Sequence, residues 1–372
     1  MARIDKLLKF IVDSKASDLH ISAGSPPRIR QFSELKKTNA PVMDGNETHS
    51  LLMETLSPTQ QGHFKAHQSV DFCYEVAGIG RFRANVFQQR LGVGGAFRAL
   101  PEKPPSLESL NMPPAIERLL DFQQGLILVT GPAGCGKTTT LGGMLNHINE
   151  KRDEHIITVE DPVEIVHKSK QCVVTHREVG LHTDSFQVAL RAALREDPDV
   201  ILVGEMRDLE TIQMAITSAE TGHLVLATLH TASAARTINR IIDVFPPEQM
   251  PQIRAMVSES IRGVISQQLL VRADGKGMQL CLEVMLATPA IAHLIRENRA
   301  YQIPSLMQIG SSRGMKLMDE TLLEYVQVGI ITPETAFSAA ENKGEFQERL
   351  GAMNFSQVAS EEEEIADFLK EE

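Results

Sequence analysis

A glycine-rich segment at residues 131–138 constrains the fold of this chain more than any other feature. It reads Gly-Pro-Ala-Gly-Cys-Gly-Lys-Thr and matches the phosphate-binding pattern G-x-x-x-x-G-K-[ST] at every fixed position. An apolar run at residues 126–129 precedes it, and residues 139–150 follow with helical periodicity. Strand, loop and helix in this order let backbone N–H groups at a helix N-terminus point at phosphate oxygens. The alternative, a chance glycine-rich turn before a helix, does not explain the complete match.

We therefore expect this loop to bind the phosphates of ATP. Lys137 would neutralise charge on the β- and γ-phosphates, and the Thr138 hydroxyl would bind Mg²⁺. The predicted nucleotide-binding residues are Gly131, Pro132, Ala133, Gly134, Cys135, Gly136, Lys137, Thr138 and Thr139.

Four short apolar runs predict the sheet around this loop. They lie at residues 126–129, 156–159, 200–203 and 224–227. Continuous Val, Ile and Leu runs of this length are typical of strands that are buried on both faces of a parallel or mixed sheet. Helical patterns alternate with them, so the fold class is α/β. From about residue 246 onward the pattern is mainly helical, and predicted helices include residues 251–270, 289–299 and 315–329.

The first 100 residues have a different pattern. An amphipathic helix is expected at the start, with Leu7, Leu8, Ile11 and Val12 on one side. Extended segments follow, separated by glycine turns, which predicts a small α+β domain around an antiparallel meander. These segments lie at residues 70–76, 81–88 and 94–99. Prolines then predict a linker, so the expected limits are residues 1–100, a linker at 101–115, and residues 116–372.

Composition excludes several classes of protein. The 372 residues are 42% hydrophobic and 23% charged, which is ordinary for a chain with a buried core. No apolar run approaches the roughly 20 residues that span a bilayer, and the N-terminus lacks the pattern of a signal peptide. Four scattered cysteines suggest neither zinc nor disulfides, and hence a reducing compartment. A net charge of −11, partly in the acidic tail, argues against non-specific nucleic-acid binding.

Acidic side chains follow two of the predicted strands, where hydrolysis of a bound nucleotide would need them. Glu160 and Glu164 come at the end of the second run, and Glu205 comes after the third. A single acid after a strand is usually a surface residue or a helix cap. Two such acids beside a complete phosphate loop favour a catalytic site. We expect Glu205 to polarise the attacking water as a base, and Glu160 to share contacts with the metal and its water.

A histidine follows the fourth predicted strand. His230, which comes shortly after the apolar run at residues 224–227, could hydrogen-bond the γ-phosphate or the attacking water. A lone histidine is more often structural, but its position beside the other strand ends favours function.

Eleven segments spread along the chain form a recognisable combination: residues 16–21, 24–30, 80–89, 131–138, 160–164, 191–199, 204–208, 220–231, 290–297, 302–305 and 314–319. Together they resemble the type II/IV secretion ATPase superfamily, and within it the retraction motors of type IV pili. The resemblance covers nearly the whole chain, and it is far more specific than the phosphate loop alone.

The resemblance implies a PAS-like N-terminal domain, a RecA-like ATPase core with a helical C-terminal portion, and a homohexameric ring. Nucleotide would lie between subunits and be contacted by arginines from the small domain. By position these are Arg81 and Arg83, with Arg98 as a further candidate. Glu205 matches the family's catalytic glutamate, and Glu160 and Glu164 join Thr138 as metal-site residues. Other implied partners are a platform protein of the inner membrane and a paralogous pilus ATPase, at the cytoplasmic face of that membrane.

Three alternatives to a retraction motor remain open. An assembly or secretion ATPase shares the core, but commonly carries extra N-terminal domains and a four-cysteine metal element. An accessory nucleotide-binding subunit is kept open by Ala292 and His293, which stand where the family commonly has Arg and Asn. A nucleic-acid translocase is disfavoured by the negative charge.

Overall fold

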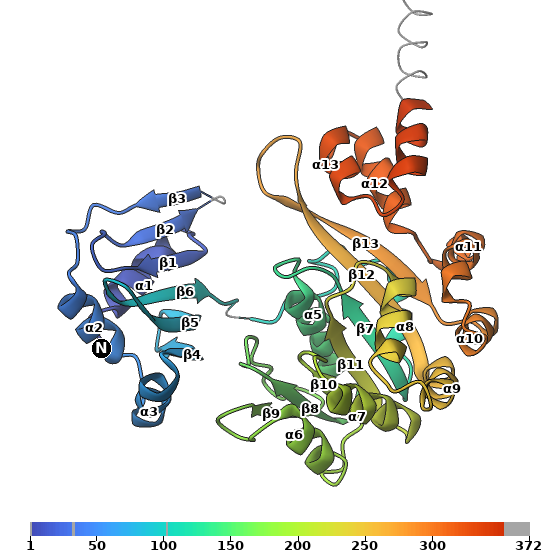
Figure 1. The fold of residues 1–372 in the computed structure, drawn as a ribbon, viewed down its shortest axis with the longest axis horizontal. Coiled ribbons are helices and arrows are strands. Elements are labelled where there is room, and N and C mark those ends of the chain that lie inside the picture. Colours follow the sequence, from blue (N-terminus) through green and yellow to red (C-terminus); the bar gives the residue numbers. More distant parts are fainter. Residues whose placement is uncertain (1, 32–33, 102, 353–372) are drawn as a thin grey trace, which may run out of the picture. The chain divides into compact units, whose positions relative to one another are not determined.

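The computed structural model describes residues 2–31, 34–101 and 103–352 (Figure 1). Contacts divide the chain into two units. The first comprises Met1–Pro104, Glu160–Lys168 and His176–Asp184, and the second comprises Pro105–Val159, Ser169–Thr175 and Ser185–Glu372. Two short segments from the middle of the sequence therefore group with the N-terminal unit.

The first unit contains a six-stranded antiparallel sheet. Its strands are β1 (Asp18–Ile21), β2 (Arg28–Gln31), β3 (Glu34–Lys37), β4 (Ser69–Val76), β5 (Gly80–Gln89) and β6 (Gly92–Ala99), in the order β3-β2-β1-β6-β5-β4. The three predicted strands are confirmed as β4, β5 and β6. Strands β1 to β3 were not predicted, because each is only four residues long and shows little periodicity.

Three helices pack with this sheet: α1 (Asp5–Asp13), α2 (Gly45–Met53) and α3 (Pro58–His67). The predicted N-terminal helix is confirmed as α1, and its Leu8 and Ile11 are fully buried. The prediction for Val12 was wrong, because this side chain is 41% exposed. Val12 lies about 100° further around the helix than Ile11, and so turns away from the core.

The second unit is built on a seven-stranded sheet. Its strands are β7 (Gly125–Thr130), β8 (His155–Glu160), β9 (Val173–Glu178), β10 (Val200–Val203), β11 (Leu224–Leu229), β12 (Ile261–Val271) and β13 (Met278–Leu286), in the order β13-β12-β7-β11-β10-β8-β9. Strands β12, β7, β11, β10 and β8 are parallel, and β13 is antiparallel to β12. The four predicted strands are confirmed as β7, β8, β10 and β11.

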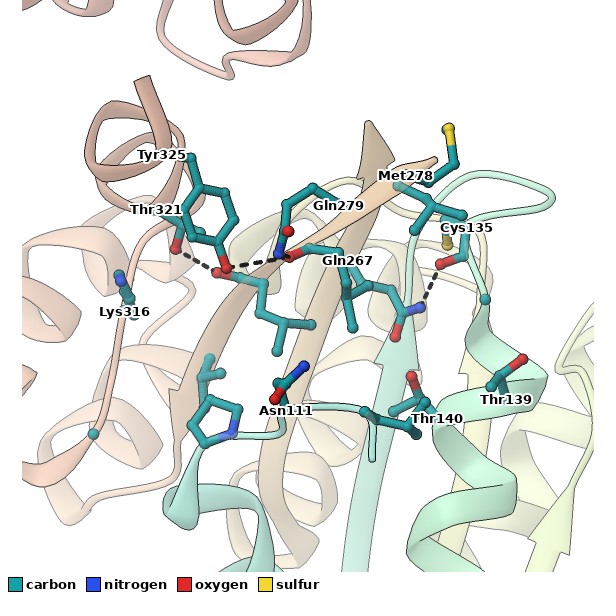
Figure 2. Close-up of a pocket in the computed structure, with 18 of the residues that line it drawn as sticks. Asn111, Cys135, Thr139, Thr140, Gln267, Met278, Gln279, Lys316, Thr321 and Tyr325 are labelled. Atoms are coloured by element: carbon teal, nitrogen blue, oxygen red, sulfur yellow. Dashed lines mark hydrogen bonds between the residues drawn. The ribbon is translucent and has the colours of Figure 1, made fainter. Parts of the chain in front are cut away.

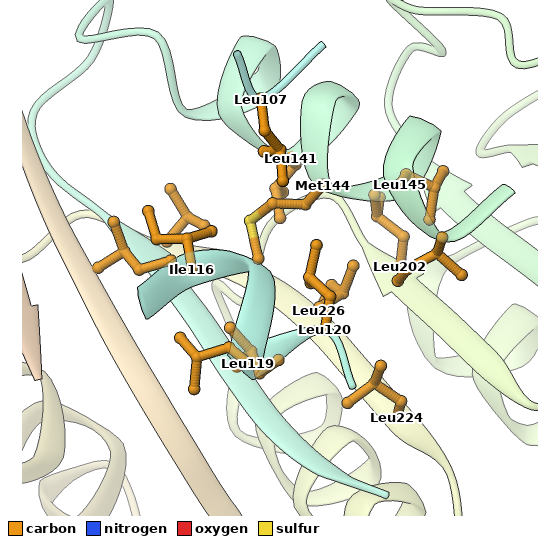
Figure 3. Packing of buried hydrophobic residues seen from close by; sticks show 14 of the residues in the cluster. Leu107, Ile116, Leu119, Leu120, Leu141, Met144, Leu145, Leu202, Leu224 and Leu226 are labelled. Carbon is orange, nitrogen blue, oxygen red and sulfur yellow. The ribbon is translucent and has the colours of Figure 1, made fainter. Parts of the chain in front are cut away.

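Helices cover both faces of this sheet. On one face, α4 (Pro114–Leu119) and α5 (Lys137–Lys151) pack their leucines on β7, β10 and β11 (Figure 3). Ile127 and Val129 of β7 belong to this cluster, while the alternating Leu126 and Leu128 are equally buried and point to the other face. That face is covered in part by α7 (Leu209–Glu220) and α9 (Met250–Ser260), which contact β7.

The remaining helices complete the second unit. They are α6 (Phe186–Ala193), α8 (Ala234–Asp243), α10 (Pro289–Arg296), α11 (Ile303–Ile309), α12 (Met318–Gln327) and α13 (Pro333–Ala339), with 3₁₀ turns at Ala300–Gln302 and Ser311–Arg313. The predicted helices at 289–299 and 315–329 are confirmed as α10 and α12. A separate hydrophobic cluster joins α12 and α13 to β13.

The predicted helix over residues 251–270 was wrong in its second half. Only α9 is helical there, and Ile261 begins β12, which pairs with β7 on one side and β13 on the other. A strand between two others and covered on both faces has a continuous apolar sequence, so its periodicity does not separate it from a buried helix. Gly263 was the local signal, since an added Cβ would lie 2.7 Å from the Leu119 side chain.

Candidate functional site

The phosphate-binding loop joins the end of β7 to the start of α5. Gly131 has φ +143°, and a Cβ on it would stand 2.2 Å from the carbonyl oxygen of Gln267. Gly136 has φ +91° and caps α5 in the left-handed region. Glycine is therefore required at both positions, and the loop lies directly against β12.

Lys137 is buried in this loop with 8% of its surface exposed. Its Nζ donates to the carbonyl oxygens of Gly131 and Pro132, at 2.9 Å each. Burial lowers the pKa of Lys137 from its ordinary value. The ammonium therefore lies at the loop, where phosphate charge would offset the cost of its burial.

Lys137, His230 and Glu205 form a continuous chain, which we call the strand-end cluster. Lys137 Nζ lies 3.3 Å from His230 Nδ1, and His230 Nε2 lies 3.1 Å from Glu205 Oε1. An ammonium can only donate, so Nδ1 accepts and the Nε2–H donates to Glu205. The cluster forms because β7, β11 and β10 are neighbouring parallel strands whose C-terminal ends lie at one edge of the sheet.

The charges around Glu205 keep it ionised. Burial raises the pKa of this carboxyl, but the hydrogen bond and charge of Arg207, followed by the charge of Lys137, lower it by more than burial raises it. Arg207 Nε lies 2.7 Å from Glu205 Oε1. The net effect is a lowered pKa, so Glu205 is a carboxylate at neutral pH and can accept a proton.

The predicted arginines make contacts within the first unit, which we call the arginine–loop contact. Arg81 donates to the carbonyl oxygens of Glu164 at 2.9 Å and Val163 at 2.8 Å. Arg83 Nη1 donates to Glu164 Oε1 at 2.7 Å, and its Nη2 donates to Asp71 Oδ2 at 2.8 Å. Hydrogen bonding to Asp71, together with the charges of Asp71 and Glu164, raises the pKa of Arg83. The predicted metal-site residue Glu164 is thus paired with a predicted phosphate-contacting arginine.

The third arginine, Arg98, is not part of this contact. Its Nε donates to Asp18 Oδ1 at 2.8 Å, between the neighbouring strands β6 and β1.

Glu160 ends β8 and is 8% exposed. Its Oε1 lies 3.8 Å from His176 Nδ1 in the first unit. Thr138 is the second residue of α5 and is half-buried. Within the described parts of the chain, no three His, Cys, Asp or Glu side chains gather in a way that could hold a metal ion. Mg²⁺ is usually held by few protein oxygens, by phosphates and by water, so the single hydroxyl of Thr138 in the phosphate-binding loop is the type of ligand that it uses.

A pocket of about 580 Å³, which was not predicted from the sequence, lies beside the loop (Figure 2). Cys135, Thr139 and Thr140 line one side, and side chains of β12 and β13 line another. Its volume suits a nucleoside. One lining residue, Gln267, is 1% exposed, and its Oε1 has no hydrogen-bond partner among the described residues. An unsatisfied buried acceptor costs about 1–3 kcal/mol.

The comparisons with known proteins agree with this geometry. The family described as "Type II/IV secretion system protein" matches residues 102–349. The "Type IV pilus retractation ATPase PilT" of Pseudomonas aeruginosa is 48% identical over 91% of this chain and 98% of that protein. The "Type IV pilus ATPase PilU" of the same organism is 37% identical over 92% and 90%.

A solved structure is also similar. The crystal structure of the pilus retraction motor PilT with bound ADP superposes with a TM-score of 0.85 at 43% identity. The match covers 93% of this chain and 98% of that one.

Proposed function

We propose that this chain, which belongs to the Type II/IV secretion system protein family, is the ATPase that powers the retraction of type IV pili. The observation that carries the chemistry is the strand-end cluster: a phosphate-loop lysine, a histidine and an ionised glutamate in one hydrogen-bonded chain. The similarity to PilT, which extends over both units, supports retraction as the work that this chemistry drives.

Each residue of the cluster has its own role in the proposed reaction. The loop and Lys137 hold the β- and γ-phosphates of ATP, and Glu205 accepts the proton of the attacking water. His230 donates its Nε2–H to Glu205 and so fixes the orientation of the carboxylate. When bound, Mg²⁺ neutralises phosphate charge, and Thr138, Glu160 and Glu164 are the residues we propose for its site.

The arginines of the small domain are proposed to act between subunits. We propose a homohexamer in which Arg81 and Arg83 of one subunit reach the phosphates bound by the next. Within one chain they contact Val163 and Glu164 instead, so this contact must open for them to act on phosphate. Shifts of the small unit would then couple hydrolysis to movement.

The proposed working place is the cytoplasmic face of the inner membrane, on a pilus platform protein and with a paralogous pilus ATPase as a further partner. No helix in the described part of the chain has the length and apolar character needed to cross a membrane. We propose no nucleic-acid partner.

The test is a gene deletion complemented with wild type, Lys137→Ala or Glu205→Gln, scored for surface pili and twitching. We expect the deletion to carry excess surface pili without retraction, and only wild type to restore movement. A deletion strain without pili would instead indicate an assembly ATPase.

An accessory subunit of the same machine is the second candidate. Ala292 is half-buried and His293 is exposed on α10, so these departures from the family pattern are accessible to a partner. The similarity to PilU also fits a chain that works beside another pilus ATPase. Normal retraction in the deletion strain, with loss of movement only when a paralogous ATPase is also impaired, would favour this candidate.

A further inference from the structure

The amide group of Gln267 connects the phosphate-binding loop with the pocket beside it. Its Nε2 donates to the carbonyl oxygen of Cys135 at 2.6 Å, inside the loop. In Figure 2 the amide nitrogen points toward Cys135, and the amide oxygen points away from it. The reversed amide would place two acceptors against each other, so this assignment of nitrogen and oxygen is determined by Cys135.

The oxygen of the same amide, Gln267 Oε1, is buried and unpaired. Gln267 is 1% exposed, and no donor among the described residues reaches its Oε1. Buried side-chain oxygens are almost always hydrogen-bonded, so an orphan acceptor that lines a pocket indicates a donor on the pocket's occupant. The backbone carbonyl oxygen of Gln267 also lies directly against Gly131, so β12 and the loop are in close contact at this residue.

The order of groups along a nucleotide identifies which of them would donate to Gln267 Oε1. The phosphates would bind in the loop, and the ribose is the group attached to them. The apolar part of the pocket, with Leu269, Met278 and Leu280, lies further along β12 and β13 and suits a base. An amide tied to the loop at Cys135 is therefore placed to meet the sugar.

We propose that Gln267 makes this site selective for ribonucleotides, because its Oε1 accepts a hydrogen bond from a ribose hydroxyl while its Nε2 holds the loop. This inference rests on the proposed ATPase function and adds a specificity-determining residue to it. Losing one neutral hydrogen bond corresponds to about tenfold in affinity.

The test measures dissociation constants for ATP, 2′-deoxy-ATP and 3′-deoxy-ATP by competition with a fluorescent nucleotide. Wild type should bind one of the two deoxy analogues about tenfold more weakly than ATP. In Gln267→Met this ratio should fall to about one, even if all three nucleotides bind more weakly through a loosened loop. A merely structural role would weaken all three and leave the ratio unchanged.

Two further variants separate the two roles of the amide. Gln267→Glu keeps an oxygen acceptor and loses the donor to Cys135, so we expect weaker binding with the discrimination retained. Gln268→Met is the matched control, since the next side chain donates to Ala339 instead, at 3.1 Å, and should leave the ratio as in wild type. If Gln267→Met does not fold, wild type and Gln267→Glu still decide the question.

Equal binding of ATP and both deoxy analogues by wild type would overturn the inference. So would discrimination that follows the 6-amino group of the base, measured with inosine triphosphate, or a ratio that survives in Gln267→Met. Failure of wild type to bind any nucleotide would instead contradict the proposed ATPase function.

Discussion

The strand-end cluster and the arginine–loop contact are both built from charged residues, but the chain assembles them differently. Lys137, His230 and Glu205 follow three neighbouring strands of one sheet, so the parallel topology itself brings them together. Arg81 and Arg83 lie on β5 of another sheet and are bonded to Val163 and Glu164 of the same unit. Within a single chain, the residues of the strand-end cluster are therefore already in contact with one another, whereas the two arginines are hydrogen-bonded to groups of their own unit.

The largest effect is expected from a substitution in the strand-end cluster, and it tests whether this cluster is catalytic. In Glu205→Gln we expect kcat for ATP hydrolysis to fall by roughly 10²–10⁴, the usual contribution of a general base. Nucleotide binding should persist, because Lys137 and the loop are intact. Glu210→Gln, an exposed carboxyl in the first turn of α7, is the control and should hydrolyse ATP normally. Unchanged turnover in Glu205→Gln would remove Glu205 from the proposed mechanism.

The second prediction tests whether the arginines leave the arginine–loop contact and bind phosphate instead. Arg83→Ala should lower kcat by roughly 10²-fold or more, in line with arginines that stabilise phosphoryl transfer. Mixing Arg83→Ala with Lys137→Ala subunits should restore part of the turnover, since the arginine and the loop then come from different chains. Mixtures of Lys137→Ala with Glu205→Gln should stay inactive, because both changes fall in one cluster.

A matched control for this experiment is Arg90→Ala, which changes an exposed arginine in the turn between β5 and β6. It should behave as wild type. If Arg83→Ala also hydrolyses ATP normally, the role of Arg83 is limited to pairing with Glu164 and Asp71 within its own unit.

The same contrast explains which features could be predicted from the sequence. The loop, Glu205 and His230 follow apolar strands, and strand ends in parallel sheets meet at one edge, so local patterns sufficed. The pairing of Arg83 with Glu164 joins residues 81 positions apart and has no local signal. Gln267 was missed because β12 has no alternating pattern, and its partner Cys135 lies 132 positions away.

The third prediction concerns the pH dependence of the strand-end cluster. Arg207 is the main group that lowers the pKa of Glu205, while burial raises it. In Arg207→Ala the pKa of Glu205 should therefore rise, and the acid limb of the kcat profile should move to higher pH. We expect kcat at pH 8 to stay within about twofold of wild type, since the carboxylate is ionised there in both proteins. An unmoved acid limb would show that another group controls it.

The smallest expected effect is on the pH dependence of stability, and it comes from the buried carboxyl of Glu283. Glu283 is 3% exposed and accepts hydrogen bonds from the backbone N–H groups of Ala234 at 2.7 Å and Met318 at 3.3 Å. It thus joins the start of α8, four residues after His230, to the start of α12. Burial, with repulsion from Glu341 and Asp319, raises its pKa from 4.5 to about 7. The arginine–loop contact also has a buried carboxyl, because Glu178 is 7% exposed and accepts a hydrogen bond from the backbone N–H of Val163 at 3.0 Å.

The sign of the stability change follows from this raised pKa. As the pH rises from 4.5 to 7, the unfolded chain releases the Glu283 proton before the folded chain does, so wild type loses stability in that window. The difference, 7 − 4.5 = 2.5 units, corresponds to about 3 kcal/mol at most. Glu283→Gln stays neutral, so its Tm relative to wild type should rise by several degrees between pH 5 and pH 8. Glu348→Gln, an exposed carboxyl, should show no such trend. A flat or falling difference for Glu283→Gln would mean that Glu283 is already ionised in the folded chain at low pH, held so by the N–H groups of Ala234 and Met318.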